Sequence, residues 1–330
     1  MNERRLIFAV KPITFPAGGV ATIYRHVEML HAHGLPAYVA LSKRPRVDFY
    51  RTSAPLLIYG SRFSRSRRRL RNTVRTGDIW VVPEVHPEMI QALVGTAAKR
   101  ILFCQNHFAL PFTADPCAGI SEFGAHDVIV TTEAARQFFR DVYRVDVPFL
   151  PAYAIDRRLF APAEVKRRQI AYMPRKLPQD AKFIEAAFRR RHARFADVPW
   201  IAIDSVTQAQ AARIMGQSAV FFSLSSRDAL ALPPLEAMSC GCLVAGYHGE
   251  GGRTYMTAEN GWWADMGDWR QCVDGLAAAL HLYHRGGSAY EACQRAMMST
   301  LENYGAGRLE TDLVAFWQRE LATPFPGELS

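Results

Sequence analysis

Two acidic residues, Asp228 and Glu236, are separated by seven residues in the stretch SSRDALALPPLEAMSCG, residues 225–241. Pro233 and Pro234 can open a helix at its first turn. The free amide groups at such a helix start, together with the helix dipole, attract a nucleoside diphosphate. A carboxylate one turn into the helix, as at Glu236, can accept two hydrogen bonds from a ribose diol. The alternative is that Glu236 only caps its own helix.

Cationic residues follow a predicted strand in the stretch IAYMPRKLPQDAK, residues 170–182. A transition state with a departing diphosphate requires positive charge nearby. Arg175, Lys176 and Lys182 compete for two such positions. A solvated pair of surface charges is the alternative.

Small and polar residues follow three strands predicted in the first half of the chain. Gly18 and Gly19 lie between the first strand and the first helix, and glycine permits close backbone approach to a ligand. Two later strands end before Glu84-Val85-His86 and Gln105-Asn106-His107. The carboxyl ends of these strands are where ligands of such sheets bind. Because the chain has ten histidines, a purely structural role is the alternative for each.

The stretch 225–241, followed by the apolar Cys-Leu-Val-Ala, resembles the E-x7-E signature of retaining family 4 (group 1) glycosyltransferases, commonly EGFGLPPLEAMACG. The resemblance implies a GT-B fold. It implies that Glu236 binds the donor ribose, that Asp228 contacts the transferred sugar, and that Leu232 and Pro233 lie beside the donor. Asp228 is one methylene shorter than the family glutamate, and Ala229-Leu-Ala replaces the usual Gly-Phe-Gly.

The resemblance extends to other motifs. It implies that Gly18 and Gly19 face the donor phosphates and the acceptor. It implies that a histidine, His107 ahead of His86, lies near the donor sugar as a catalytic residue. It also implies an arginine and a lysine that grip the diphosphate, for which we expect Arg175 and Lys182, although their spacing departs from the family's.

The glycine-rich stretch 246–252 corresponds to the family loop beside the nucleotide. Thr254-Tyr255-Met256 stands where a glutamate is usual. No Asp-x-Asp motif for a divalent metal occurs, and Asp265 and Asp268 are too loosely placed to form one. A helix dipole with arginine and lysine can replace the metal. We therefore expect no metal and no cofactor.

Short apolar runs alternate with helical patterns, which is typical of a parallel sheet with helices on both faces. The expected strands are 6–10, 37–41, 79–82, 100–104, 128–131, 170–173, 200–204, 219–223 and 243–245. The expected helices are 20–33, 181–192, 208–216 and one starting near 234. The pattern predicts an α/β fold of two doubly wound, Rossmann-like domains that face a cleft.

Prolines between residues 148 and 162 mark the predicted domain boundary. We expect an acceptor-side domain at 1–150 and a nucleotide-sugar domain at 151–330, with a last helix able to cross back. No apolar run approaches the ~20 residues of a membrane span. We expect no signal peptide and, since the six cysteines form no metal-binding spacing, a reduced cytoplasmic protein with buried thiols.

The formal charge of +9 is uneven: residues 1–150 have 20 basic against 12 acidic residues, and residues 151–330 have 20 against 19. The excess is densest in SRFSRSRRRLRNTVR, residues 61–75, where an anionic inner-membrane face is one expected partner. That contact would use five arginines, Arg65, Arg67, Arg68, Arg69 and Arg71. A solvated helix face is the alternative, and nucleic acid is not expected, because few aromatic residues interleave the basic run.

The resemblance thus implies a metal-independent transferase of polysaccharide biosynthesis. It would move a sugar from a nucleotide-sugar to a glycan or lipid-linked acceptor, with retention at the anomeric carbon. Two alternatives stay open: a nucleotide-sugar 2-epimerase of the same fold, and a catalytically inactive glycan-binding relative.

Overall fold

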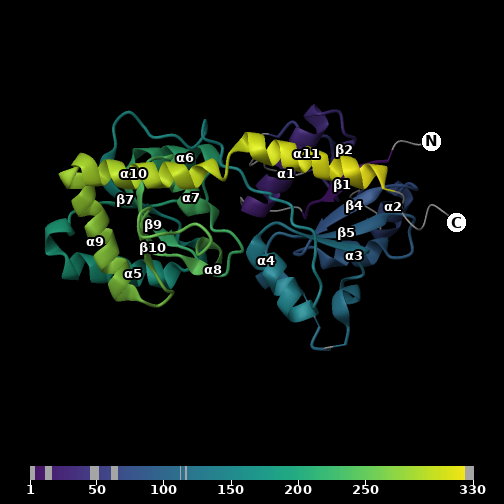
Figure 1. Cartoon of the computed structure of the whole chain (residues 1–330), viewed down its shortest axis with the longest axis horizontal. Helices are drawn as coiled ribbons and strands as arrows, with labels where there is room; N and C mark the ends of the chain where they lie inside the picture. Colours follow the sequence, from purple (N-terminus) through teal and green to yellow (C-terminus); the bar gives the residue numbers. More distant parts are fainter. Residues whose placement is uncertain are drawn as a thin grey trace. The chain divides into compact units, whose positions relative to one another are not determined.

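A computed structural model of the chain describes residues 4–11, 17–44, 52–60, 66–111, 113–115 and 117–323 (Figure 1). The chain divides into two compact units. The first unit combines Met1–Tyr153 with Gly307–Ser330, and the second unit is Ala154–Ala306. The last helix, α11 (Ala306–Ala322), therefore packs with the beginning of the chain.

The first unit is built on a six-stranded parallel sheet in the order β3-β2-β1-β4-β5-β6. Its strands are β1 (Leu6–Ala9), β2 (Ala37–Leu41), β3 (Leu56–Ile58), β4 (Ile79–Pro83), β5 (Lys99–Cys104) and β6 (Asp127–Val130). All residues of β1 and β4 are buried, as expected for continuous apolar runs in a parallel sheet covered on both faces. The strand β3 was not predicted.

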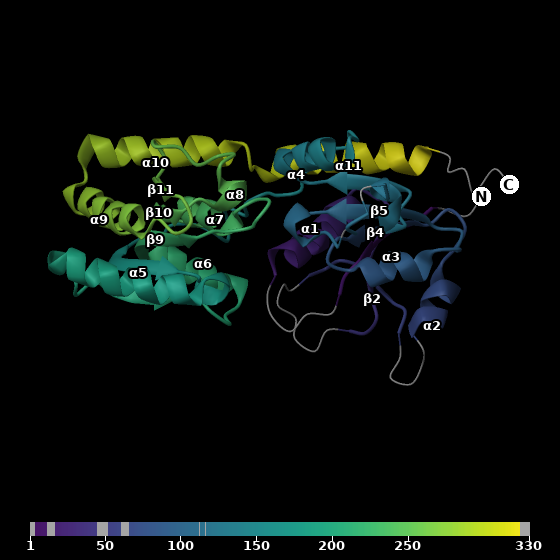
Figure 2. The ribbon, with the colours of Figure 1, turned by 90° about the horizontal axis from the view of Figure 1, so that it is seen from below.

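Helices cover both faces of this sheet. The α-helices are α1 (Gly18–Ala32), α2 (Ser66–Thr73), α3 (Pro87–Leu93), α4 (Glu133–Phe138) and α11. Short turns of other helix types are η1 (His107–Ala109), η2 (Gly119–Phe123) and η3 (Phe139–Tyr143). One apolar core unites α1 and α11 with the Phe8 side of the sheet, and a second unites α2, α3 and α4 with the Trp80 side. Figure 2 shows α11 and α3 on opposite sides of β4 and β5.

The second unit has a five-stranded parallel sheet in the order β11-β10-β9-β7-β8. Its strands are β7 (Arg167–Tyr172), β8 (Trp200–Ala202), β9 (Ser218–Leu224), β10 (Leu243–Tyr247) and β11 (Trp262–Ala264). The central strands β9 and β10 are buried along their whole length. The short edge strand β11 was not predicted.

The helices of the second unit are α5 (Pro178–Arg191), α6 (Gln208–Gln217), α7 (Leu232–Ser239), α8 (Gly249–Gly252), α9 (Trp269–Arg285) and α10 (Gly287–Glu302). Short 3-10 turns are η4 (Pro174–Lys176) and η5 (Ala193–Phe195). α5 packs against α9, while α6 and α10 pack against α7. Figure 1 shows α5 and the α6–α7 pair on opposite sides of β9 and β10. Both units are thus doubly wound α/β structures, as the sequence predicted.

The structure also bears on the cysteines and on membrane-spanning segments. Five of the six cysteines are buried free thiols, but Cys117 is exposed, so the expectation of buried thiols was wrong for that residue. Within the described residues, no helix combines the length and apolarity that a membrane crossing requires.

Candidate active site

The start of α7 lies directly after the loop that carries Asp228. β9 ends at Leu224, and α7 begins at Leu232 with Pro233 in its first turn. The residue before the helix, Ala231, has no side chain that could cap the first-turn amides. Pro233 and Pro234 have no N–H, so the Leu232 amide and the helix dipole offer a place for an anionic group, and the donor contact of Leu232 and Pro233 stays a prediction.

Asp228 forms an ion pair with Lys176. The side chain of Asp228 is 17% exposed and that of Lys176 is 44% exposed, so the pair lies at a partly solvated surface. Lys176 is the last residue of η4, where exposed Arg175 precedes it, whereas Lys182 lies exposed on α5. The structure thus pairs Lys176, one of the three cations considered for the diphosphate, with Asp228. The assignment of Arg175 and Lys182 to a diphosphate stays a prediction.

Tyr255 lies near both Asp228 and Glu236. Its side chain is buried, and its hydroxyl donates a hydrogen bond to the carbonyl oxygen of Ala231, just before α7. Burial raises the pKa of Tyr255 well above its ordinary value, with additional effects of the Tyr304, Asp228 and Glu236 charges. Both carboxylates therefore lie within electrostatic reach of one hydroxyl. Tyr255 was noted in the sequence only as part of the segment that replaces the family glutamate.

Glycines allow the segment after β10 to pack on the Asp228 loop. A Cβ atom on Gly251 would lie 2.5 Å from the carbonyl oxygen of Asp228, and one on Gly249 would lie 2.5 Å from that of Ser226. The amide of Glu250 donates to the same Ser226 oxygen at 3.0 Å. The glycine-rich stretch, which the resemblance put beside the nucleotide, therefore packs against the backbone around Asp228 and supports it.

In the first unit, Gly18 and Gly19 form the first turn of α1. A Cβ atom on Gly19 would lie 3.2 Å from Oε1 of Gln105, a distance that few real contacts reach. The side chain of Gln105, which follows β5, therefore packs directly on the glycine turn. Because glycine has no Cβ, two loops at the carboxyl edge of the sheet can meet here.

His107 lies in the same edge segment. Its imidazole is buried and packs between the rings of Phe108 and Phe138, with ring centroids 4.2 and 5.1 Å away. His86 precedes α3 and is also buried, with Nε2 3.7 Å from the carboxylate of Glu88. Burial lowers the pKa of His86. Both imidazoles occupy packed surroundings, and their predicted catalytic roles stay predictions.

The carboxylate of Glu84 is an edge feature that the sequence analysis did not single out. Its two oxygens accept hydrogen bonds from the backbone amides of Gln105 and Asn106, each at 3.0 Å. Only 4% of Glu84 is exposed, and this burial raises its pKa to about 7, against the lowering effect of the hydrogen bonds. A glutamate directly after a buried strand was the available signal.

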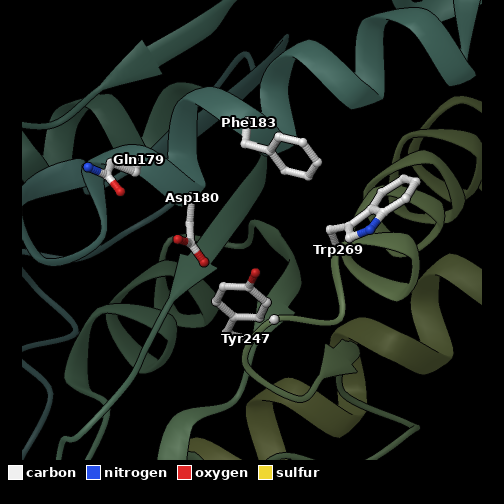
Figure 3. A pocket seen from close by; sticks show the side chains of 6 residues that line it. Gln179, Asp180, Phe183, Tyr247 and Trp269 are labelled. Atoms are coloured by element: carbon white, nitrogen blue, oxygen red, sulfur yellow. The ribbon is translucent and has the colours of Figure 1, made fainter.

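A separate pocket in the second unit lies between the start of α5 and the segment before α9. It is lined by Gln179, Asp180, Phe183, Tyr247, Gly267 and Trp269 (Figure 3). The hydroxyl of Tyr247 points toward Asp180 and hydrogen-bonds with it, and Phe183 meets Trp269 edge-on. None of the predicted site residues lines this pocket.

The basic segment forms α2 in part. Leu70 is buried in the core, while Arg68, Arg69 and Arg71 are exposed. Arg71 donates to the carbonyl oxygen of Gly95 at 3.1 Å. Arg65 and the side chain of Arg67 lie outside the described residues. No described group of three or more histidine, cysteine, aspartate or glutamate residues could hold a metal ion.

Residues 201–296, from β8 into α10, match the family model described as glycosyl transferases group 1. A curated relative, the alpha-1,6-glucosyltransferase of Actinobacillus pleuropneumoniae serotype 7 (strain AP76), is 26% identical over 257 residues. That alignment covers 73% of this chain and 71% of the relative. The matched family segment contains β9, the Asp228 loop and the whole of α7.

Solved structures show the fold over nearly the full chain. A glycosyltransferase from Rickettsia africae ESF-5 has a TM-score of 0.71 at 12% identity, covering 98% of this chain and all of that chain. A mutant of S. aureus TarM, solved with fondaparinux, alpha-GlcNAc-glycerol and UDP, has a TM-score of 0.73 at 9% identity, covering 97% and 100%. Anabaena HepE with UDP-glucose has a TM-score of 0.69 at 10% identity, covering 96% and 99%. A segment of the second unit thus matches the group 1 glycosyltransferase model, and the two units share the GT-B fold of the solved glycosyltransferases.

Proposed function

We propose that this protein transfers a hexosyl group from a nucleoside diphosphate sugar to a hydroxyl of a glycan or lipid-linked acceptor, with retention and without a metal. The observation that carries the proposal is the arrangement around the start of α7. There Asp228 and the uncapped first turn lie within the matched segment, and Lys176 of η4 pairs with Asp228. UDP-glucose is the first donor to test, because the curated relative is an alpha-1,6-glucosyltransferase and HepE was solved with UDP-glucose.

In the proposed reaction the bond between the anomeric carbon and the diphosphate oxygen breaks, and a bond to the acceptor oxygen forms on the same face. The acceptor hydroxyl loses its proton to the departing diphosphate oxygen. Negative charge grows on the departing diphosphate. The amides at the start of α7 and the cations of residues 175–182 stabilise that charge. Glu236 accepts hydrogen bonds from the ribose, and Asp228 accepts one from the sugar, after Lys176 shifts toward the phosphates.

Four of these assignments stay predictions: the ribose role of Glu236, the sugar contact of Asp228, the catalytic role of His107, and the acceptor side in the first unit. The uncapped helix start supports the first two. The packing of Gln105 on the glycine turn supports the last, because it concentrates polar backbone at the carboxyl edge of the first sheet.

The experiment is a donor screen of UDP-, ADP- and GDP-sugars with a mixed glycan acceptor, following release of nucleoside diphosphate. The anomeric configuration of the product is then read by NMR. Wild type should release the diphosphate only with acceptor, and Asp228→Asn should reduce the rate. Interconversion of the donor without acceptor would identify an epimerase. Donor binding without turnover would identify an inactive relative.

We further propose a cytoplasmic location at the inner membrane face, which rests on the exposed arginines of α2.

A further inference from the structure

A buried glutamate, Glu84, holds the turn that follows β5 at the carboxyl edge of the first sheet. Glu84 follows β4, and its carboxylate reaches across to the segment after the neighbouring strand β5. Oε2 accepts the amide of Gln105 and Oε1 accepts the amide of Asn106, each at 3.0 Å. A carboxylate that accepts two successive amides fixes the path of that backbone in two directions.

Other contacts hold the same turn from its remaining sides. The hydroxyl of Tyr153 donates to the carbonyl oxygen of Gln105 at 3.1 Å. The side-chain oxygen of Asn106 accepts the amide of Phe108 at 3.2 Å, which starts the short helix that carries His107. The Gln105 carboxamide packs on Gly19 of α1. Displacement of residues 105–106 would therefore move both His107 and the contact with the glycine turn.

We propose that Glu84 is a positioning residue for the acceptor side of the reaction: it fixes residues 105–107, hereafter the β5 turn, and through Gln105 it fixes this turn against the start of α1. The inference rests on the proposed function for the meaning of the acceptor side. Glu84 acts through the β5 turn and does not itself touch the substrate, since only 4% of it is exposed.

The charge of Glu84 matters because only the ionised carboxylate accepts two amides with full strength. The titratable groups around it are few among the described residues. Cys104 on β5 has its pKa raised well above the ordinary value by burial, with the Glu84 charge contributing. His86, before α3, has its pKa lowered by burial, and Glu88 and Lys11 lie beside it. Because the pKa of Glu84 is raised to about 7, protonation below neutral pH weakens these two hydrogen bonds and loosens the β5 turn, while it removes the cost of the buried charge.

The test is steady-state kinetics of Glu84→Gln from pH 5.5 to 9, with acceptor and donor varied separately. We expect kcat/KM for the acceptor to fall by about tenfold to a hundredfold at pH 8, as misplaced groups typically cost. The KM for the donor should stay close to that of wild type. The wild-type decline below pH 7 should be absent in the variant. Glu133→Gln removes the same charge from an exposed position of this unit and should keep the wild-type profile.

Hydrogen exchange separates this inference from the proposed function. In Glu84→Gln, peptides covering the β5 turn should exchange faster, while those of the second unit stay unchanged. If wild type transfers no sugar from any donor, the proposed function fails, and unchanged exchange at the β5 turn would then overturn the positioning role as well. An unaltered pH profile, or an equal loss for donor and acceptor, would also overturn it.

Should Glu84→Gln not fold, Tyr153→Phe loosens the same turn by one hydrogen bond. It should lower acceptor kcat/KM while keeping the pH decline, and unchanged acceptor kinetics would contradict the proposal.

Discussion

The buried carboxylate of Glu84 should make the stability of the first unit depend on pH. Its pKa rises from the ordinary value of 4.5 to about 7 in the folded chain because burial disfavours the charged form. The folded state therefore binds this proton more tightly than the unfolded state does. The resulting contribution to stability is fully present below about pH 4.5 and is lost as the pH rises through 7.

The magnitude follows from the shift. A difference of one pKa unit corresponds to about 1.4 kcal/mol, so integrating between pH 5 and pH 8 gives a loss of roughly 2 to 3 kcal/mol from this one group. Glu84→Gln removes the titration and replaces one accepting oxygen by an amide that donates. Its free energy of unfolding, minus that of wild type, should therefore increase by about 2 to 3 kcal/mol on going from pH 5 to pH 8, which means that the variant becomes relatively more stable.

The assay is native-state hydrogen exchange in increasing urea at both pH values. Peptides of β1 and β5 report the first unit, and peptides of β9 and β10 are an internal control. Glu133→Gln, with an exposed side chain, should differ from wild type by the same amount at both pH values. If the difference between Glu84→Gln and wild type does not change with pH, Glu84 titrates in its ordinary range and the reasoning from burial is wrong.

Three further predictions concern the proposed reaction. Glu236→Gln should weaken donor binding by about tenfold to a hundredfold, since a lost charged hydrogen bond costs about 1.5–3 kcal/mol; unchanged calorimetric affinity would contradict the ribose role. Transfer should continue in EDTA, because the start of α7 and the cations of residues 175–182 neutralise the diphosphate; loss of activity that Mn²⁺ or Mg²⁺ restores would refute this. Changing Arg68, Arg69 and Arg71 to Gln should reduce co-sedimentation with phosphatidylglycerol vesicles at low salt, at about 1 kcal/mol per arginine; equal sedimentation of both proteins would leave a solvated helix face.

The sequence predicted the buried parts of the fold well. The strand β2 was predicted with the bounds that the structure shows, and β5 and β9 within one residue at each end. These strands are buried on both faces, and burial imposes continuous apolar runs. The strands β3 and β11 each have three residues at a sheet edge, and such short runs show no period. The apolar face of α11 likewise does not reveal which unit will cover it.

Side-chain pairing was harder to predict than backbone position. The spacing of Arg175, Lys176 and Lys182 did not decide which cation reaches which position, because the direction of each side chain depends on how η4 turns after β7. The result is an ion pair between Lys176 and Asp228. Glu84 was missed for a similar reason. A glutamate after a strand is unremarkable in sequence. Its role comes from two amides in the turn after the neighbouring strand β5, 21 and 22 residues further along the chain.

The return of α11 to the first unit determines the order in which the protein can be completed on the ribosome. Trp317 and Leu313 are fully buried in a core that also contains Leu6 and Phe8. The unit made first must therefore wait, with part of its apolar surface uncovered, until the C-terminal segment emerges. The second unit, by contrast, is continuous from Ala154 to Ala306 and can fold while that helix is still being synthesised. A nascent chain arrested shortly before residue 306 should consequently protect the second unit from protease while the first stays susceptible.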